Sequence, residues 1–222
     1  MKVIDGMWDL VVKIIFRVVC RPTRRLDLER IGSRYGGWIV PTDFLHPKGI
    51  CYSAGSGEDI TFDLELARRF GCEVYAIDPT PRSQRYVGDV AAGVPGFHSV
   101  PMGLWSSTRR MRFYAPRDRH EVSHSIANLQ RTMDFFEADC VTVADLMARN
   151  GHRELDLLKM DIEGAEYDVL RNIIATEVRV RILGVEFQRP GALQRTSRMA
   201  RQLKQAGFEL VSVDGFNFTF LY

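Results

Sequence analysis

Apolar and polar residues alternate along most of the chain in blocks that predict strands and helices in turn. Buried strands are predicted at 49–53, 72–78, 97–105, 111–116, 155–162 and 179–187. Helices are predicted at 58–70, at about 164–175 and at 193–206, the first and last of them ending at glycines. Strand–helix alternation of this kind predicts an α/β fold with a mostly parallel sheet covered by helices on both faces.

The carboxyl end departs from this alternation. Two apolar runs, 208–213 and 216–222, flank Asp214–Gly215, which is the pattern of an antiparallel β-hairpin with a two-residue turn. The last strand is therefore expected to run against its predecessor. A Rossmann-like parallel sheet closed by one reversed strand resembles the arrangement of class I methyltransferases.

Length and composition fit one domain with a short extension. The chain has 222 residues, 45% of them hydrophobic and 26% charged, which is ordinary for a globular protein. We expect an amino-terminal extension at 1–34 and a single domain at 35–222. The net charge of +2 argues against a protein built to bind nucleic acid, so no nucleic-acid partner is expected.

The 4 cysteines indicate a reducing compartment. They are scattered and form no C-x-x-C pair, so reduced thiols are expected in place of disulfides or a zinc site. The sequence therefore predicts a cytoplasmic protein, with possible peripheral attachment at a membrane through its amino terminus.

Met7–Cys20 predicts an amphipathic helix, because its three charged residues recur at every fourth position. Fourteen helical residues reach about 21 Å, too short to span the roughly 30 Å of bilayer hydrocarbon. Arginines follow at once, which suits a helix lying on an anionic membrane surface. The same apolar face could instead be covered by the domain itself or by a second copy of the chain in a homodimer.

A glycine turn, "AGSG" at 54–57, follows the first strand of the alternating region. The dinucleotide motif G-x-G-x-x-G would need glycine where the chain has Ile60. Glu58 and Asp59 would also repel a pyrophosphate at the start of the next helix. S-adenosylmethionine carries cationic groups and no phosphate, so acids there are tolerable. Asp78 ends the second strand, where a carboxylate can accept hydrogen bonds from a ribose diol.

Two stretches carry a family resemblance. "YSAGSGEDITFDLELARRFGCEVYAIDPTP" and "DLLKMDIEGAEYDVL" resemble the FkbM-type S-adenosylmethionine-dependent methyltransferases, from about Tyr35 to the end. The resemblance implies a class I methyltransferase fold, S-adenosylmethionine as cofactor, and O-methylation of a small molecule or a sugar hydroxyl.

The cofactor is expected to lie along the glycine turn and the strand ends beside it. The residues expected to bind it are Ser53, Gly55, Ser56, Gly57, Glu58, Asp59, Asp78, Pro79 and Asp161. Many class I enzymes have an acid where this chain has Ser53, so Glu58 or Asp59 is expected to replace that acid at the methionine amino group.

The catalytic candidates are Asp161, Glu163 and His124. A carboxylate at a strand end in a cleft can position a hydroxyl or remove its proton. His124 lies between two serines in a segment that could cover the cofactor. No metal site is predicted, although Asp161, Glu163 and Glu186 could in principle converge on a hard cation.

A structural interpretation of the same motif was also open. In it Lys159 and Glu186 form a buried ion pair, and Glu163 and Glu166 favour the amino terminus of the following helix.

The acceptor is left open by the sequence. Five arginines, at 109, 110, 112, 117 and 119, form a solvated face or contact an anionic metabolite such as a phosphorylated sugar. A methyltransferase acting on RNA or protein, and a non-catalytic S-adenosylmethionine-binding protein at a membrane, are the alternative functions.

Overall fold

The computed structural model describes residues 11, 15–16, 20–118, 121–187 and 192–222. Most of the helix predicted at Met7–Cys20 lies outside these described residues. Two of its described side chains, Phe16 and Cys20, are buried. The Phe16 ring packs edge-on against Phe216 and Phe218, with ring centroids 6.1 Å and 5.2 Å apart. The domain itself therefore covers this part of the segment.

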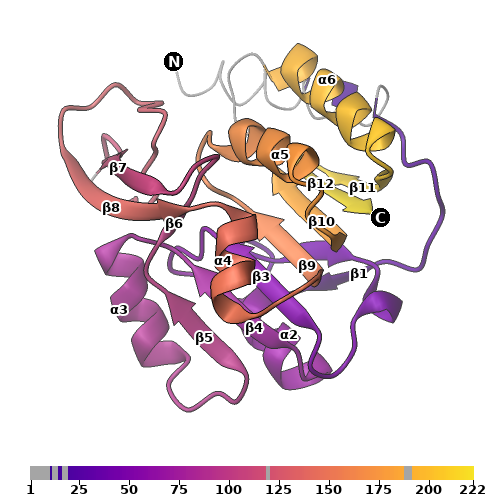
Figure 1. The fold of residues 1–222 in the computed structure, drawn as a ribbon, viewed down its shortest axis with the longest axis horizontal. Helices are drawn as coiled ribbons and strands as arrows, with labels where there is room; N and C mark the ends of the chain where they lie inside the picture. The colour runs from indigo at the N-terminus through magenta and orange to yellow at the C-terminus, as the bar shows by residue number, and fades with distance from the viewer. Residues whose placement is uncertain (1–10, 12–14, 17–19, 119–120, 188–191) are drawn as a thin grey trace.

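A seven-stranded sheet forms the centre of the molecule (Figure 1). Across the sheet the strands are β11 (Glu209–Asp214), β12 (Asn217–Leu221), β10 (Val180–Glu186), β9 (Leu155–Met160), β3 (Ile50–Ala54), β4 (Glu73–Ile77) and β5 (Phe97–Val100). β12 is antiparallel to both neighbours, and the other neighbouring pairs are parallel. The prediction of a mostly parallel sheet with a carboxyl-terminal antiparallel hairpin is confirmed.

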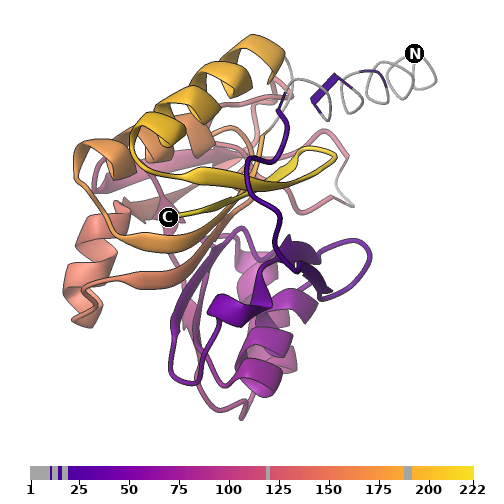
Figure 2. The same ribbon diagram turned by 90° about the vertical axis from the view of Figure 1, so that its right-hand side faces the viewer.

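Helices cover both faces of this sheet (Figures 1 and 2). The helices are α2 (Thr61–Phe70), α3 (Pro81–Val90), α4 (Val143–Asn150), α5 (Glu166–Ala175) and α6 (Ala192–Gln205). Residues of α4, α5 and α6 share one hydrophobic core with β9, β10 and β12. Residues of α2 pack in a second core with β1 and β2, and α3 joins α2 in a third cluster.

Local signals explain where several helices begin and end. α2 ends at Gly71, whose φ of 67° is the left-handed conformation that glycine adopts freely. The Thr142 side chain accepts a hydrogen bond from the Asp145 backbone and so caps the start of α4. α3 was not predicted, because Pro79 and Pro81 were interpreted only as a stop for β4. Pro81 in fact occupies the first turn of α3, where proline is favoured.

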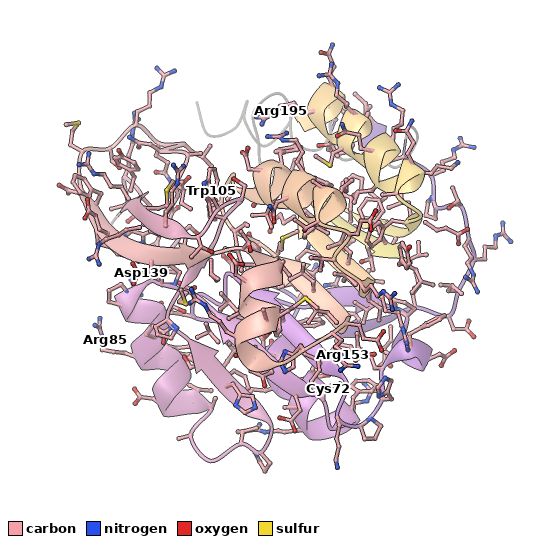
Figure 3. The ribbon with its side chains drawn as sticks, viewed as in Figure 1. Cys72, Arg85, Trp105, Asp139, Arg153 and Arg195 are labelled. Carbon is pink, nitrogen blue, oxygen red and sulfur yellow. The ribbon has the colours of Figure 1, made fainter. Side chains whose placement is uncertain are left out.

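Two smaller sheets flank the large one. One contains β6 (Gly103–Leu104), β8 (Phe135–Val141) and β7 (Arg109–Tyr114), in that order. Asp139 of this sheet lies toward the left of the view in Figure 3. The other sheet pairs β1 (Glu29–Ile31) with β2 (Trp38–Val40), followed by the short helix η1 (Thr42–Phe44). The boundary expected between residues 34 and 35 falls inside this hairpin, so β1 belongs to the folded domain.

Two remaining expectations concern the cysteines and a membrane span. All 4 cysteines are free and buried, as predicted. Within the described ranges, none of the helices has the length and apolarity needed to cross a membrane.

Candidate functional site

The order in which strands are added to the sheet reverses between β3 and β9. The chain proceeds outward from β3 through β4 to β5, and later outward on the other side from β9 to β10. Ligands of open α/β sheets bind outside the carboxyl ends of the strands at such a point. A cavity of about 410 Å³ lies here, lined by the residues that follow β3, β4, β9 and β10.

The backbone at Ala54 and Gly55 is hydrogen-bonded to the ends of both neighbouring strands, β4 and β9, beside this cavity. The Gly55 N–H donates to the Ile77 carbonyl, and the Asp161 N–H donates to the Ala54 carbonyl, each at 3.0 Å. Gly55 has a φ of +81°, and a Cβ added there would lie 1.7 Å from the Asp161 carbonyl oxygen. Only glycine permits this approach of the turn to the strand end that carries Asp161.

Asp78 shapes the glycine turn from the end of β4. Its Oδ2 accepts a hydrogen bond from the Gly57 N–H at 3.0 Å, and its Oδ1 accepts one from the Thr80 N–H at 2.8 Å. Asp78 lines the cavity with Gly55, Ser56, Gly57 and Pro79. Each carboxylate oxygen keeps a second lone pair, so Asp78 can still receive ligand hydroxyls.

The two acids at the start of α2 are engaged within the protein. Glu58 forms an ion pair with Arg82, with N–O distances of 2.6 and 2.7 Å. Asp59 accepts hydrogen bonds from the Ser33 hydroxyl at 2.6 Å and from the Gly36 N–H at 3.2 Å. Both acids line the cavity, but Asp59 serves first to hold the loop that joins β1 to β2.

Ser53 is the one expected cofactor contact that does not line the cavity. Its side chain is fully buried within β3, opposite Lys159 in the parallel register. The expectation that Ser53 binds the cofactor is therefore not supported, because a residue of the strand interior cannot reach a ligand beyond the strand end. Ser56, in contrast, lines the cavity. Like the Ser53 hydroxyl, its hydroxyl is buried and has no hydrogen-bond partner among the described residues.

Three carboxyl groups also line the cavity. Asp161 and Glu163 follow β9, and Glu186 ends β10. Burial, followed by the charge of Asp161, raises the pKa of Glu163 to about 7. Burial, followed by the charge of Asp161 and the hydrogen bond to it, raises the pKa of Glu186 to about 8. Near neutral pH these two glutamates therefore hold protons that ordinary glutamates have lost.

Glu163 is held by the loop at 121–127. Its backbone has a φ of 53°, an uncommon conformation for a residue other than glycine. The Ser125 hydroxyl donates to the Glu163 carbonyl at 2.6 Å, and the Ser123 side chain hydrogen-bonds to the Glu163 carboxylate. Backbone strain of this kind clusters at functional sites.

Glu166 has the structural role that was expected of it. It is fully buried, and its carboxylate accepts hydrogen bonds from the Ile162 and Gly164 N–H groups. Burial raises its pKa to about 7, and these backbone donors oppose the rise. Glu166 thus fixes the turn that carries Glu163.

Lys159 does not form the expected ion pair with Glu186. Its ammonium donates to the Gly55 carbonyl at 2.8 Å, and no ion pair of Lys159 occurs within the described part of the chain. The Trp38 ring centroid lies 6.0 Å from the ammonium. The prediction was wrong because the glycine turn brings a backbone carbonyl to Lys159, whereas Glu186 faces Asp161.

His124 also lines the cavity. Its Nδ1 lies 2.9 Å from the Val122 carbonyl oxygen, so we assign the proton to Nδ1 and the free lone pair to Nε2. The ring packs edge-on against Phe136 at 5.1 Å. His124 can therefore accept a proton through Nε2.

The predicted arginine cluster lies away from this cavity. No arginine lines it among the described residues, and Arg119 lies outside them. Arg110 and Arg112 form ion pairs with Glu137 on the small three-stranded sheet. For metals, no group of three or more His, Cys, Asp or Glu side chains in the described ranges could hold an ion.

Several lining residues were not recognised from the sequence. Tyr35 and Trp38 come from the β1–β2 hairpin, and the ring of Trp38 lies against the backbone of Gly184 in β10. The turn at 214–217 lines the cavity because β12 is antiparallel to β10. The antiparallel hairpin predicted at the carboxyl end could have been used to predict that its turn lies at the cavity. Nothing in the sequence pattern predicted the positions of Tyr35 and Trp38.

Strand order, one reversed strand and a glycine turn at the switch point together define the class I methyltransferase fold. The family model of the methyltransferase FkbM domain matches residues 51–210, and the chain belongs to this family. The resemblance seen in the sequence motifs is thereby confirmed.

Individual relatives are distant. The probable methyltransferase-like protein 24 of Rattus norvegicus is 26% identical over 138 residues, which are 62% of this chain and 31% of the relative. The match thus spans about a third of that protein's length. A fibrillarin from Aeropyrum pernix with natively bound S-adenosyl-L-methionine has 13% identity and a TM-score of 0.49, covering 90% of this chain and 84% of its own. A fibrillarin pre-rRNA processing protein from Methanococcus jannaschii has 12% identity and a TM-score of 0.48, covering 88% and 83%.

Proposed function

We propose that this protein transfers the methyl group of S-adenosylmethionine to a hydroxyl of a small molecule such as a sugar. The observation that carries the proposal is that the glycine turn with Asp78 and the three acids Asp161, Glu163 and Glu186 line one and the same cavity. Family membership supports methyl transfer in general. The hydroxyl acceptor is the further part of the proposal, and carboxyl groups in the cavity that could accept the hydroxyl proton support it.

The residues present fit this cofactor. The Ser56 hydroxyl is buried without a partner in the described structure, so it can bond to a polar ligand. Asp78 retains lone pairs for ribose hydroxyls. Glu58 and Asp59 at the start of α2 are compatible with a cationic cofactor and unfavourable for a pyrophosphate. When bound, S-adenosylmethionine supplies an electrophilic methyl group on a positively charged sulfur.

The acceptor hydroxyl must lose its proton while its oxygen forms the new C–O bond. The C–S bond breaks in the same step, and its electron pair stays on sulfur, which becomes a neutral thioether. We assign the proton to the Glu163 carboxylate, whose pKa of about 7 suits a general base near neutral pH. Asp161 holds the acceptor beside Glu163, and His124 is the second candidate base.

The first test is calorimetry with S-adenosylhomocysteine and, separately, with NAD. Binding of S-adenosylhomocysteine alone is expected, and binding of NAD alone contradicts the cofactor assignment. The acceptor is then sought by incubating the protein with methyl-labelled S-adenosylmethionine and a metabolite extract. Label in a small molecule is expected. Label only in RNA or protein, or none at all, contradicts the proposed acceptor class.

The base is tested with the same labelling assay. Glu163→Gln preserves size and should lower the rate by about 100-fold or more, since general bases contribute roughly that much. His124→Gln should leave most of the rate. The reverse result assigns the base to His124 and refutes the role of Glu163.

A further inference from the structure

Asp161, Glu163 and Glu186 bring three carboxyl groups together on the cavity lining. Its cationic groups are Lys159 and, when protonated, His124. Lys159 does not neutralise the carboxyl groups by contact, because its ammonium bonds to the Gly55 carbonyl. Asp214, another acid of the lining, is already paired with Arg30. Glu58 is likewise paired with Arg82.

Asp161 and Glu186 interact directly. Glu186 is hydrogen-bonded to Asp161, which requires one proton between the two carboxyl groups. The charges that face this pair come from Glu163 beyond β9, from Lys159 within it, and from Glu121 near Glu163. A cation bound between Asp161 and Glu186 would replace the shared proton and relieve the repulsion between them.

The same cavity is lined by an aromatic residue, Tyr35. Desolvation together with the charges of Asp161, Glu186 and Glu163 raises the pKa of its phenol. The side chain is 92% exposed, so its ring face is available to a ligand. Asp59 fixes the loop that presents it, through Ser33. Carboxylates beside an accessible aromatic ring form the kind of site that binds organic ammonium groups.

The cofactor does not account for all of these acids. In the sheet, β10 is two strands from β3 and three from β4, so Glu186 lies roughly 10–15 Å across from the glycine turn and Asp78. One carboxylate satisfies the single ammonium of S-adenosylmethionine. Glu186 is therefore left facing the half of the cavity where the acceptor must enter.

We propose that the acceptor carries a protonated amine near the hydroxyl that is methylated, as an amino sugar does, and that Asp161 and Glu186 bind this ammonium beside Tyr35. The inference rests on the proposed methyl transfer and narrows its substrate class. The anionic acceptor considered from the arginine cluster is disfavoured, because that cluster does not line the cavity and the carboxylates would repel a phosphate.

The test measures binding of four related sugars to the protein saturated with S-adenosylhomocysteine. The probes are glucosamine, its neutral derivative N-acetylglucosamine, glucose, and glucose 6-phosphate. Glucosamine is expected to bind about 10- to 100-fold more tightly than the neutral sugars, the range for charge-assisted hydrogen bonds. The phosphate should bind no better than glucose. Equal binding of all four, preference for the phosphate, or no binding by any of them overturns the inference.

A variant series ties the preference to this pair of carboxyl groups. Glu186→Gln keeps the size of the side chain and removes its charge, so the preference for glucosamine should disappear. Glu154→Gln is the matched control, because Glu154 is exposed and lies outside the cavity lining. A preference that survives Glu186→Gln, in a variant shown to be folded by circular dichroism, refutes the assignment.

Binding of S-adenosylhomocysteine is measured first for each protein, which separates the two proposals. If the unmodified chain fails to bind it, the proposed function fails. If it binds S-adenosylhomocysteine but shows no preference for the amine, only the present inference fails.

Discussion

The Gly55→Ala substitution tests the geometry at the centre of the site. Two costs arise together, because Gly55 has a φ of +81° and its added Cβ would lie 1.7 Å from the Asp161 carbonyl oxygen. The left-handed backbone costs a non-glycine residue about 1–2 kcal/mol. Ordinary contact begins near 3.4 Å, so the two backbone segments must separate by 1.7 Å or rearrange. Overpacking of this kind costs about 1–3 kcal/mol.

The sum, about 2–5 kcal/mol, is a large part of the total stability of a typical domain. For a chain of this length it corresponds to a fall in melting temperature of roughly 4–20 °C. Thermal unfolding followed by circular dichroism measures that fall. Binding of S-adenosylhomocysteine should weaken as well, because the displaced strand end carries Asp161.

Gly57→Ala provides the matched control in the same turn. Gly57 also has a positive φ, of +55°, but its added Cβ would meet only a Val122 methyl carbon at 3.8 Å. It should therefore show the backbone cost alone, about 1–2 kcal/mol. If both variants melt at the same temperature, the close approach of Gly55 to Asp161 carries no energetic weight and the reasoning is wrong.

Three further predictions concern stability. The pKa of Glu186 is raised from 4.5 to about 8, so its contribution to stability is complete below about pH 4.5 and is lost as the pH rises through 8. Glu186→Gln should therefore stabilise the protein by up to about 5 kcal/mol near pH 9 and hardly at all near pH 4.5, and equal effects at both pH values would contradict this. Phe16→Ala should lower the free energy of unfolding by about 3–5 kcal/mol, because the ring is fully buried against Phe216 and Phe218. A loss below about 1 kcal/mol would show that this contact is not part of the core. Asp59 accepts from Ser33 and Gly36 through one carboxylate oxygen and from Thr61 through the other, so the amide of Asp59→Asn, which has one oxygen, cannot accept from both sides. The loop is then held less firmly, and chymotrypsin should cleave after Tyr35 faster than in the unmodified protein. An unchanged cleavage rate would mean that Asp59 does not restrain the loop.

Most strands of the large sheet could be predicted because each is a compact apolar run followed by a helix signal or a tight turn. The exception is the strand predicted at 97–105, which divides into β5 of the large sheet and β6 of the three-stranded sheet. Two of the elements that were not predicted are α3 and β8. Pro81 both ends the extended segment after β4 and begins α3. In β8 exposed and half-buried positions alternate over five residues before the strand reaches the interior, so no continuous apolar run marks it.

The site was predictable to the extent that function requires residues at strand ends. The glycine turn, Asp78, Asp161 and Glu163 all line the cavity because they follow parallel strands. The partners of these residues were not predictable. Lys159 donates to the Gly55 carbonyl and not to Glu186 because of the path that the backbone takes at Gly55. That path cannot be read from the pattern of apolar and polar residues.

Phe16 connects the amino-terminal segment to the cavity through a packing contact between side chains. Its ring contacts Phe216, and Phe216 belongs to the cavity wall. A membrane, partner or protease that withdrew Phe16 would remove the support behind that wall. By thermodynamic reciprocity, a ligand that orders the wall would hold the segment more firmly in place. The rate at which a protease cleaves the first residues, compared with and without S-adenosylhomocysteine, would then indicate whether a ligand occupies the cavity.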